Sequence, residues 1–269
     1  MSEIRAKAEP GAFLMQRTQA IIRQPSMRIA EGEVTHIDRV PMDVARGFEQ
    51  HRSYVELLQR HGLGIVEAPA APEHPDGLFV EDALVMIDAV AIITRPGALS
   101  RRGETASIRA VVESLGLRDF SIASPATVDG GDVLVTDRHV FVGQTTRSNA
   151  AAVQQFDRIC RPLKRHALGA KVQGCLHLKS AVTALPDGSL IAVDGWVDVE
   201  WFRDLGYRVH VTADTSGGDV LCIGSTVVLP ADAQRAAAQI SDLGFPVETL
   251  DVSELQKIEA GVTCLSVLV

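Results

Sequence analysis

Three hairpin-like segments recur along the chain, and they constrain its fold more than any other feature. Each starts with an aspartate and an apolar run, at Asp82-Ala-Leu-Val, Asp132-Val-Leu-Val and Asp219-Val-Leu-Cys, and each has a valine eight residues after the aspartate. Two of the three follow a Gly-Gly pair. Two short apolar runs joined by a tight turn are typical of a β-hairpin. The repetition therefore predicts a fold that uses one supersecondary unit several times.

The spacing of these segments predicts how many units the fold contains. Their starts lie 50 and then 87 residues apart, so the second interval has room for one more unit. Residues 177–193 (HLKSAVTALPDGSLIAV) fit this interval, with Pro-Asp-Gly as the turn. A fifth unit would pair a strand near residues 20–23 with the segment 263–269. A period of about 45 residues indicates a radial repeat closed by its own termini, unless such short hairpins are similar by chance.

Segments with helical periodicity separate the hairpins. The clearest is residues 43–61, which end at Gly62. Its apolar stripe consists of Val44, Phe48, Val55, Leu57 and Leu58. Further helices are expected at residues 105–115, 148–159, 198–205 and 231–243. Strands and helices that alternate in this way predict an α/β fold.

A long irregular segment, residues 24–42, interrupts the pattern and contains Pro25, Gly32 and Pro41. Loops of this length in a compact domain usually serve a function, so we expect it to act as a lid over a site. Residues 1–19 are polar and are expected to form a loosely ordered N-terminal extension. Because no Gly/Ser/Pro-rich linker divides the rest, residues 20–269 are predicted to form a single domain.

Composition disfavours several functions. The net charge of −8 argues against binding to nucleic acid or a membrane surface, which needs a basic face. No apolar run approaches the roughly 18 residues of a membrane span, and the start MSEIRAKAEP lacks the apolar core of a signal peptide. The four cysteines, at positions 160, 175, 222 and 264, show neither zinc-ligand spacing nor a disulfide framework. We therefore expect a cytoplasmic protein without a structural metal site.

Cys264 and His177 are the candidate catalytic residues, although each also has an ordinary structural explanation. A lone cysteine among apolar neighbours, as in GVTCLSVLV, is most often a small core residue. His177 alternates with two leucines and fits a hydrogen-bonded histidine on a strand. Cys175 would share its strand face and could help to bind a metal, but no second ligand pair accompanies them. The aspartates could cap turns, and the arginines could be solvated surface charges.

Radial repetition changes this interpretation, because equivalent strand ends of all units converge on one axis. Asp82, Asp129, Asp132, His177 and Cys264 all fall at such ends. A cysteine, a histidine and carboxylates around one site form the arrangement of a nucleophile, a base and an orienting acid. The surplus of carboxylates suggests a cationic substrate. The nearby arginines suggest that the same substrate also carries an anionic group.

Six motifs in order carry a family resemblance. They are FVED, ITRPGA followed by SRRGE, DGGDVL, FVG followed by Arg147-Ser-Asn149, LHLKS, and the C-terminal VTCLS. From about residue 20 to residue 269, the chain resembles the dimethylarginine dimethylaminohydrolases of the pentein, or guanidine-modifying, superfamily. This resemblance implies a five-bladed α/β propeller of ββαβ units around a pseudo-fivefold axis, in agreement with the repeats.

The resemblance also implies roles for individual residues. Cys264 would be the nucleophile, His177 the general acid and base, and Asp129 the carboxylate that completes the triad. Asp82 and Asp129 would hold the guanidinium nitrogens, with Glu81 as a further substrate-binding carboxylate. The α-carboxylate and α-amine of the substrate would contact Arg101, Arg147, Asp76 and the backbone carbonyls near Val34 and Ile258.

The implied reaction is hydrolysis of Nω-methylated arginines, such as asymmetric dimethylarginine and monomethylarginine. It yields citrulline and dimethylamine or methylamine through a covalent Cys-amidino intermediate, without a metal or organic cofactor. Arginine deiminase and another guanidine hydrolase or amidinotransferase are alternative enzymes, and a non-catalytic binding propeller is an alternative of another class. Asp132, as the equivalent of Asp219, would be structural. The expected partner is a small-molecule substrate, and the sequence leaves open whether the chain forms a homodimer.

Overall fold

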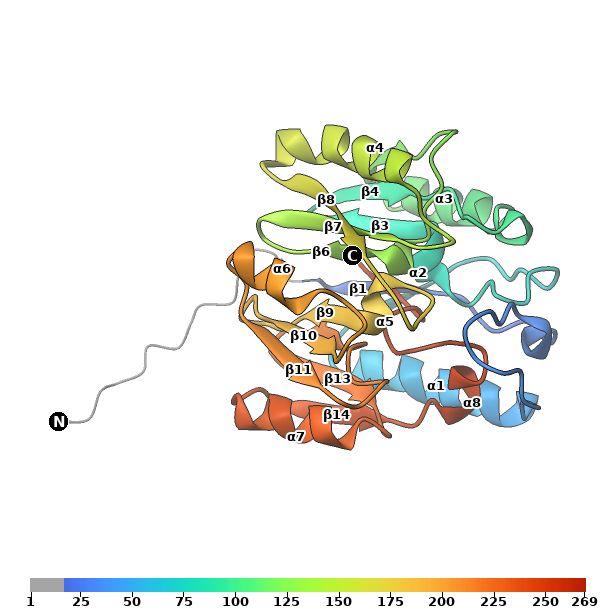
Figure 1. Ribbon diagram of the computed structural model, residues 1–269. Coiled ribbons are helices and arrows are strands. Elements are labelled where there is room, and N and C mark those ends of the chain that lie inside the picture. Colours follow the sequence, from blue (N-terminus) through green and yellow to red (C-terminus); the bar gives the residue numbers. More distant parts are fainter. Residues whose placement is uncertain (1–16) are drawn as a thin grey trace.

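Five three-stranded sheets carry the fold in the computed structural model, which describes residues 17–269 (Figure 1). In each sheet, the middle strand is antiparallel to one neighbour and parallel to the other. The sheets are β15 (Val267–Leu268), β1 (Gln19–Ile22) and β2 (Gly64–Glu67); β3 (Leu84–Ile87), β4 (Val90–Ile93) and β5 (Arg118–Ser121); β6 (Val133–Val135), β7 (His139–Gln144) and β8 (His166–Lys171); β9 (Val182–Ala184), β10 (Leu190–Val193) and β11 (Val209–Thr212); and β12 (Leu221–Ile223), β13 (Thr226–Pro230) and β14 (Val247–Leu250).

One helix joins the middle strand of each sheet to its parallel neighbour, since a tight turn cannot connect parallel strands. These helices are α1 (Val44–Arg60), α3 (Glu104–Ser114), α4 (Ala150–Cys160), α6 (Val199–Asp204) and α7 (Gln234–Asp242). They lie towards the outside of the molecule, with the strands closer to its centre (Figure 1). Asp43, Asn149 and Asp198 cap three of them by accepting a backbone N–H with their side chains. Each blade is therefore a ββαβ unit, as the sequence predicted.

The first and last strands of the chain close the propeller. Ala20 pairs with Leu268 and Ile21 with Val267 in antiparallel register, and β2 then adds to the other side of β1. The C-terminus accordingly ends near the centre of the molecule rather than at its edge (Figure 1). This pairing confirms the predicted fifth unit and the pseudo-fivefold propeller.

The apolar core lies between the sheets and the helices. All four residues of β3, of β4 and of β10 are buried. Continuous apolar runs of this kind are typical of strands that are covered on both faces. One cluster joins β3 and β4 of one blade to Phe156 and Cys160 on α4 of the next. Packing between blades therefore fixes how the starts of the blades meet at the centre.

The start of the fourth blade differs from the prediction. His177 does not lie on a strand: it precedes α5 (Leu178–Ala181), a single helical turn, and β9 begins only at Val182. Single turns also precede β3 and β6, as α2 (Val80–Ala83) and the 3-10 turn η3 (Gly130–Asp132). A four-residue turn is too short to show helical periodicity, so the alternation around His177 resembled a strand.

The remaining short helical segments are η1 (Ile29–Glu31), η2 (Leu99–Arg101), η4 (Arg161–Leu163) and α8 (Ser253–Gln256). Most of the predicted N-terminal extension, residues 1–16, lies outside the described residues. Residue Gln19 belongs to β1, and the Arg17 guanidinium donates to the carbonyl of Asp88 (2.7 Å). Among residues 17–269, no helix is long and apolar enough to cross a membrane.

Candidate active site

Short turns at the starts of the five blades meet near the centre of the propeller. The turn α2 contacts η3, and η3 contacts α5. The backbone N–H of Glu81 on α2 donates to the carbonyl of Cys264 in the turn before β15 (3.4 Å). In that same turn, the N–H of Thr263 donates to Asp219 at the start of β12 (3.1 Å). Residues far apart in the sequence are thereby brought to one place.

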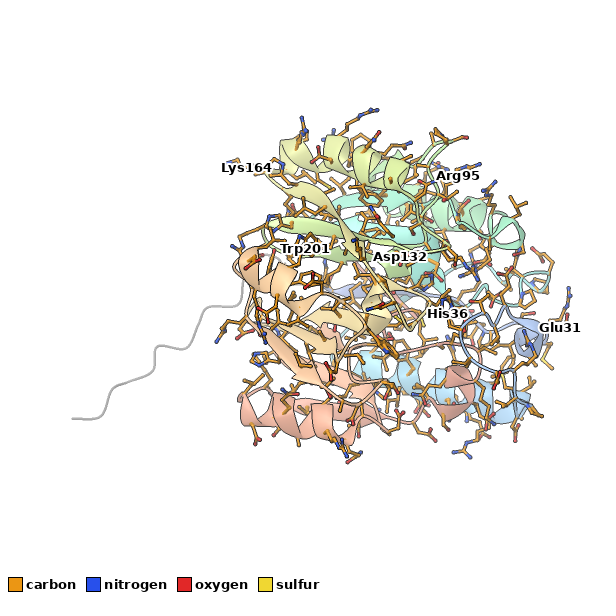
Figure 2. The ribbon with its side chains drawn as sticks, viewed as in Figure 1. Glu31, His36, Arg95, Asp132, Lys164 and Trp201 are labelled. Carbon is orange, nitrogen blue, oxygen red and sulfur yellow. The ribbon has the colours of Figure 1, made fainter. Side chains whose placement is uncertain are left out.

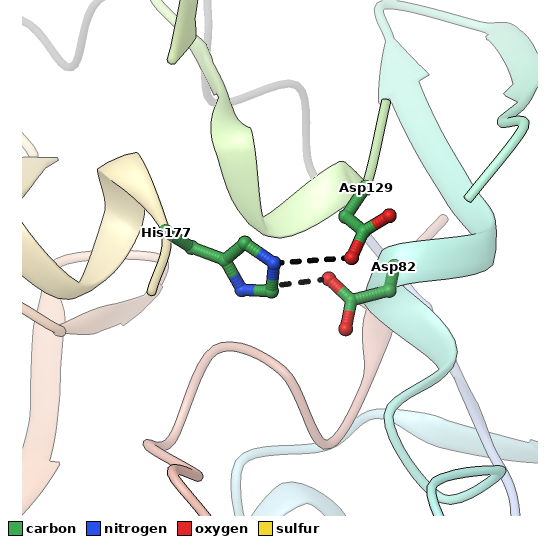
Figure 3. Close-up of side chains that lie close together, drawn as sticks. All are labelled: Asp82, Asp129 and His177. Carbon is green, nitrogen blue, oxygen red and sulfur yellow. Dashed lines mark hydrogen bonds and ion pairs between the residues drawn. The ribbon is translucent and has the colours of Figure 1, made fainter. Parts of the chain in front are cut away.

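His177 faces two aspartates, Asp129 and Asp82, at this centre (Figure 3). Its Nε2 is 3.2 Å from Oδ2 of Asp129, and its Nδ1 is 3.9 Å from Oδ1 of Asp82. All three side chains are buried. Burial alone lowers the pKa of His177, but the charge of Asp82, the bond to Asp129 and the charge of Asp132 together raise it to about 9. The imidazole is therefore protonated at neutral pH and can donate a proton.

Asp132 holds the backbone that presents these side chains and lies near the centre of the molecule (Figure 2). Its carboxylate accepts bonds from the Leu178 N–H (3.0 Å), the Thr145 hydroxyl (2.6 Å) and the Ser148 hydroxyl (2.5 Å). The Ser148 oxygen in turn accepts the N–H of Asp129 (3.2 Å). Burial raises the pKa of Asp132 to about 6. Asp132 thus links the turns of Asp129 and His177, in agreement with the structural role expected for it.

The Gly-Gly pair of the third blade is required by close contacts. A Cβ on Gly130 would lie 1.9 Å from the carbonyl oxygen of Glu81. A Cβ on Gly131 would lie 2.6 Å from Nδ1 of His177 and 2.9 Å from Oδ1 of Asp82. Without side chains, the backbone can approach, and the Gly131 N–H donates to that same oxygen of Asp82 (3.0 Å). Both glycines therefore serve the site rather than the hairpin alone.

Cys264 is partly buried in a turn before β15, not on the strand itself. Its thiol donates to the carbonyl of Gly261 (3.3 Å), and the N–H of Gly261 lies 3.4 Å from the sulfur. Burial raises the pKa of Cys264 well above its ordinary value, and the carboxylates of Asp219, Glu81 and Asp82 raise it further. The resting thiol is therefore protonated, and a cation near it would favour the thiolate.

Glu81 binds side chains other than the histidine. Its carboxylate binds the ammonium group of Lys179 and accepts the Thr263 hydroxyl (3.1 Å). It lines a separate cavity of about 190 Å³, which Lys179, Thr263 and Cys222 also line. This placement supports the backbone beside Cys264. A direct contact of Glu81 with a substrate stays a prediction.

Arg101 is buried and is already bound to protein groups. Its guanidinium donates to Oδ2 of Asp82 (2.5 Å) and to both carboxylate oxygens of Glu104 (3.0 and 2.8 Å). It also donates to the carbonyls of Asp76 (3.1 Å) and Phe79 (3.3 Å). Together with His177, Arg101 keeps the pKa of Asp82 below its usual range despite burial. The structure thus places Arg101 as a support of Asp82, and its contact with a substrate carboxylate stays a prediction.

Most of the other residues that were predicted to bind the substrate line one small cavity. It is lined by Glu33, Asp76, Phe79, Asp82, Arg101, Arg147, Leu176, His177, Ile258, Glu259 and Cys264. Its free space is about 20 Å³, enough for about one water molecule. Arg147 lies 3.6 Å from Asp129 and bonds to Glu33 (2.8 Å). Val34 is next to Glu33 and packs against an apolar cluster that includes Ile258.

The group Asp82, Asp129 and His177 also meets the geometric requirement of a metal site. One ligand atom from each lies within 4.8 Å of the others. The high pKa of His177 means that a metal would have to displace its proton at neutral pH. The expectation of a reaction without a metal stays a prediction.

Known proteins resemble this chain in both sequence and structure. No family model matches it. It is 42% identical to the dimethylarginine dimethylaminohydrolase of Streptomyces coelicolor, over 94% of this chain and 97% of that protein. It is 32% identical to the enzyme of that name from Pseudomonas aeruginosa, over 91% and 97% of the two chains. The chain belongs to the dimethylarginine dimethylaminohydrolase family. A solved structure of the Pseudomonas aeruginosa protein, a mutant complexed with citrulline, has a TM-score of 0.88 and 30% identity, with 95% of this chain and 100% of that chain covered.

Three further residues shape the site and were not predicted from the sequence. Lys179 binds Glu81, Asp219 holds the turn of Cys264, and Glu33 binds Arg147. The sequence does mark Asp219, because it occupies the same position in its repeat as Asp82 and Asp132. Lys179 belongs to the LHLKS motif, and Glu33 lies in the segment expected to form a lid.

Proposed function

We propose that this protein hydrolyses Nω-methylated arginines, namely asymmetric dimethylarginine and monomethylarginine, to citrulline and dimethylamine or methylamine. The observation that carries the proposal is the shared cavity lined by Cys264, His177 and Asp82, with Asp129 bonded to the histidine. A thiol, an imidazolium and two carboxylates are the groups this reaction needs. The family relatives with this name, at 42% and 32% identity, support the substrate class.

Substrate binding would activate the nucleophile. In the empty site, burial and the charges of Asp219, Glu81 and Asp82 keep the Cys264 thiol protonated. A guanidinium held by Asp82 and Asp129 brings a positive charge close to that thiol. This charge lowers the free energy of the thiolate, and the thiol proton passes to water. The two carboxylates also fix the plane of the guanidinium, so the sulfur attacks the central carbon from its face.

The reaction then has two covalent steps. The sulfur of Cys264 bonds to the guanidinium carbon, and the tetrahedral adduct breaks its bond to the methylated nitrogen. His177 gives its proton to that nitrogen, because an amide anion is too basic to leave. The neutral imidazole next takes a proton from water, whose oxygen attacks the amidino carbon. The carbon–sulfur bond then breaks, and the hydroxyl proton of the adduct passes to the sulfur, which frees citrulline and restores the Cys264 thiol.

The opposite end of the substrate would be held by its amino acid group. Arg147 offers a guanidinium to the α-carboxylate, and the carboxylate of Asp76 would accept the α-ammonium. The backbone carbonyls near Val34 and Ile258 would complete this end. Such contacts favour free methylarginine over a guanidine that lacks an amino acid group.

Turnover by the purified protein tests this proposal. Asymmetric dimethylarginine and monomethylarginine should yield citrulline and an equal amount of dimethylamine or methylamine, with little turnover of arginine. Cys264→Ser should lose at least about a thousandfold in kcat, since a serine hydroxyl is a far weaker nucleophile here. Cys222→Ser is the matched control, because this free cysteine lines the other cavity. Preference for arginine would make the protein a deiminase, and activity retained in Cys264→Ser would exclude that residue as the nucleophile.

We also propose that the enzyme works in the cytoplasm and that residues 20–269 form one domain. The four free cysteines support the location, because reduced thiols are typical of that compartment. The closure of β1 with β15 across the whole chain supports the single domain. Whether the protein forms a homodimer stays a matter for measurement of its mass in solution.

A further inference from the structure

Glu33 occupies both anchors proposed for the amino acid end of the substrate. Its backbone N–H donates to the Asp76 carboxylate, at 3.2 and 3.1 Å from the two oxygens. Its side-chain carboxylate accepts Nη2 of Arg147 (2.8 Å) and the hydroxyl of Ser100. One residue of the chain thus places an N–H on Asp76 and a carboxylate on Arg147. The amino acid end of a substrate would make the same two contacts.

Glu33 and a substrate cannot make these contacts together. The cavity between the anchors has about 20 Å³ of free space, which is room for about one water molecule and not for an amino acid. Arg147 is 6% exposed, and two anions face its buried guanidinium: Asp129 at 3.6 Å, which stays in either state, and the carboxylate of Glu33 at 2.8 Å. Glu33 is 37% exposed, so its carboxylate is already partly hydrated and becomes fully hydrated when it leaves Arg147. The substrate carboxylate can therefore replace the Glu33 carboxylate on Arg147 at a small cost in free energy.

The surrounding segment holds Glu33 in this position without depending on its charge. Gly32 packs so closely on Asp76 that a Cβ there would lie 2.6 Å from Oδ1. Farther along, Glu259 accepts the N–H groups of Thr35 (3.0 Å), His36 and Ile37 (3.1 Å). These backbone contacts remain when the Glu33 side chain alone is changed.

We propose that Glu33 is an affinity-determining residue: it acts as an internal competitor whose carboxylate must leave Arg147 before a substrate amino acid group can bind. This inference rests on the proposed function, because it takes the two anchors from it. A competitor that favours the empty state lowers the fraction of protein that is ready to bind, and the apparent affinity falls by that fraction. Glu33 therefore sets KM and leaves the chemistry at Cys264 unchanged.

Glu33→Gln tests this, with Glu31→Gln as the matched control. The first removes the charge on Arg147 and keeps the backbone N–H on Asp76. Glu31 lies in the same segment, but it pairs with exposed Arg28 (2.6 Å) at the rim of the molecule (Figure 2). For Glu33→Gln we expect KM for asymmetric dimethylarginine and the Kd of citrulline, measured by calorimetry, to fall together by about two- to tenfold, the range of a partly exposed ion pair. The control should match the unchanged protein, and kcat should stay within about twofold in both.

Two other results would overturn the inference. A rise in KM and Kd in Glu33→Gln would mean that Glu33 binds the substrate, for example its ammonium group. Unchanged values would mean that its bond to Arg147 does not compete. The calorimetry separates this inference from the proposed function. If no amine is released but the Kd of citrulline is still lower for Glu33→Gln, the proposed reaction is rejected and the inference about Glu33 stands. If neither the unchanged protein nor Glu33→Gln binds citrulline, the inference about Glu33 fails, and the turnover measurement alone decides the proposed function.

Discussion

At the scale of single residues, His177 shows how the site stores its proton. The ring is buried among Asp82, Asp129 and Asp132, so each carboxylate that would be costly to bury alone gains a positive neighbour. This balance makes the imidazolium part of the folded structure, and in the proposed reaction the same group is the acid for the leaving amine. A catalytic proton held this way has a measurable effect on stability.

The pH dependence of stability should report the charge of His177. Its pKa is about 9 in the folded protein and about 6.5 in an unfolded chain. Folding therefore strengthens proton binding, so this stabilisation is complete below about pH 6.5 and is lost as the pH rises through about 9. The difference in free energy of unfolding between the unchanged protein and His177→Gln should therefore fall by about 3 kcal/mol from pH 6 to pH 10. Urea unfolding at both pH values measures it.

His166→Gln is the control for that measurement, because its side chain is 70% exposed. Its effect on the free energy of unfolding should be small at both pH values. If the effect of His177→Gln were the same at pH 6 and pH 10, the imidazole would be neutral in the folded protein. It could not then supply the first proton of the reaction.

At the scale of secondary structure elements, single turns at the starts of the blades position the side chains of the site. A turn of three or four residues aims a side chain at the axis without using a strand position, so each strand can stay buried on both faces. The cost is close packing, which is why η3 begins with two glycines. The geometry of His177 therefore depends on an element that carries no catalytic side chain.

Gly131→Ala should damage catalysis more than stability. The new Cβ would lie 2.6 Å from Nδ1 of His177, whose other nitrogen is bonded to Asp129, so the ring has to shift. We expect a loss of about a hundredfold in kcat, since small displacements of reacting groups have this effect, and a loss of about 1–3 kcal/mol in stability. Gly64→Ala is the control, because its nearest neighbour would be 3.6 Å away. Full activity of Gly131→Ala would show that the ring position is not critical.

The hairpins, the crossover helices and the closing strand pair were predictable from sequence because each has a period or a repeat. The single turns were not, because they are shorter than a helical period. The buried face of α1 was only partly predicted: Gln50, His51 and Tyr54 are buried, while Val44 and Phe48 are partly buried. Gln50 donates to the hydroxyl of Ser253, and the Tyr54 hydroxyl contacts that of Ser266. Pairings across about 200 residues leave no local signal in the sequence.

At the scale of the whole molecule, the position of Cys264, the proposed nucleophile, depends on closure of the ring. Cys264 lies just before β15, the last strand, which can pair only after β1 has taken its place. The same turn is held by Glu81 from the second blade and by Asp219 from the fifth. The position of Cys264 is therefore a property of the complete propeller and not of one blade.

One buried hydrogen bond ties the first blade to this closing segment. The hydroxyl of Tyr54 on α1 is 2.7 Å from the hydroxyl of Ser266, two residues after Cys264. Both side chains are buried, so each single change, Tyr54→Phe or Ser266→Ala, should lower the free energy of unfolding by about 1–2 kcal/mol. In the double variant, neither hydroxyl is left without its partner, so the loss should be about 1 kcal/mol smaller than the sum. Urea unfolding of the four proteins measures this coupling. Strictly additive losses would mean that the bond does not contribute to closure, and the ring would then rest on the pairing of β1 with β15 and on apolar packing.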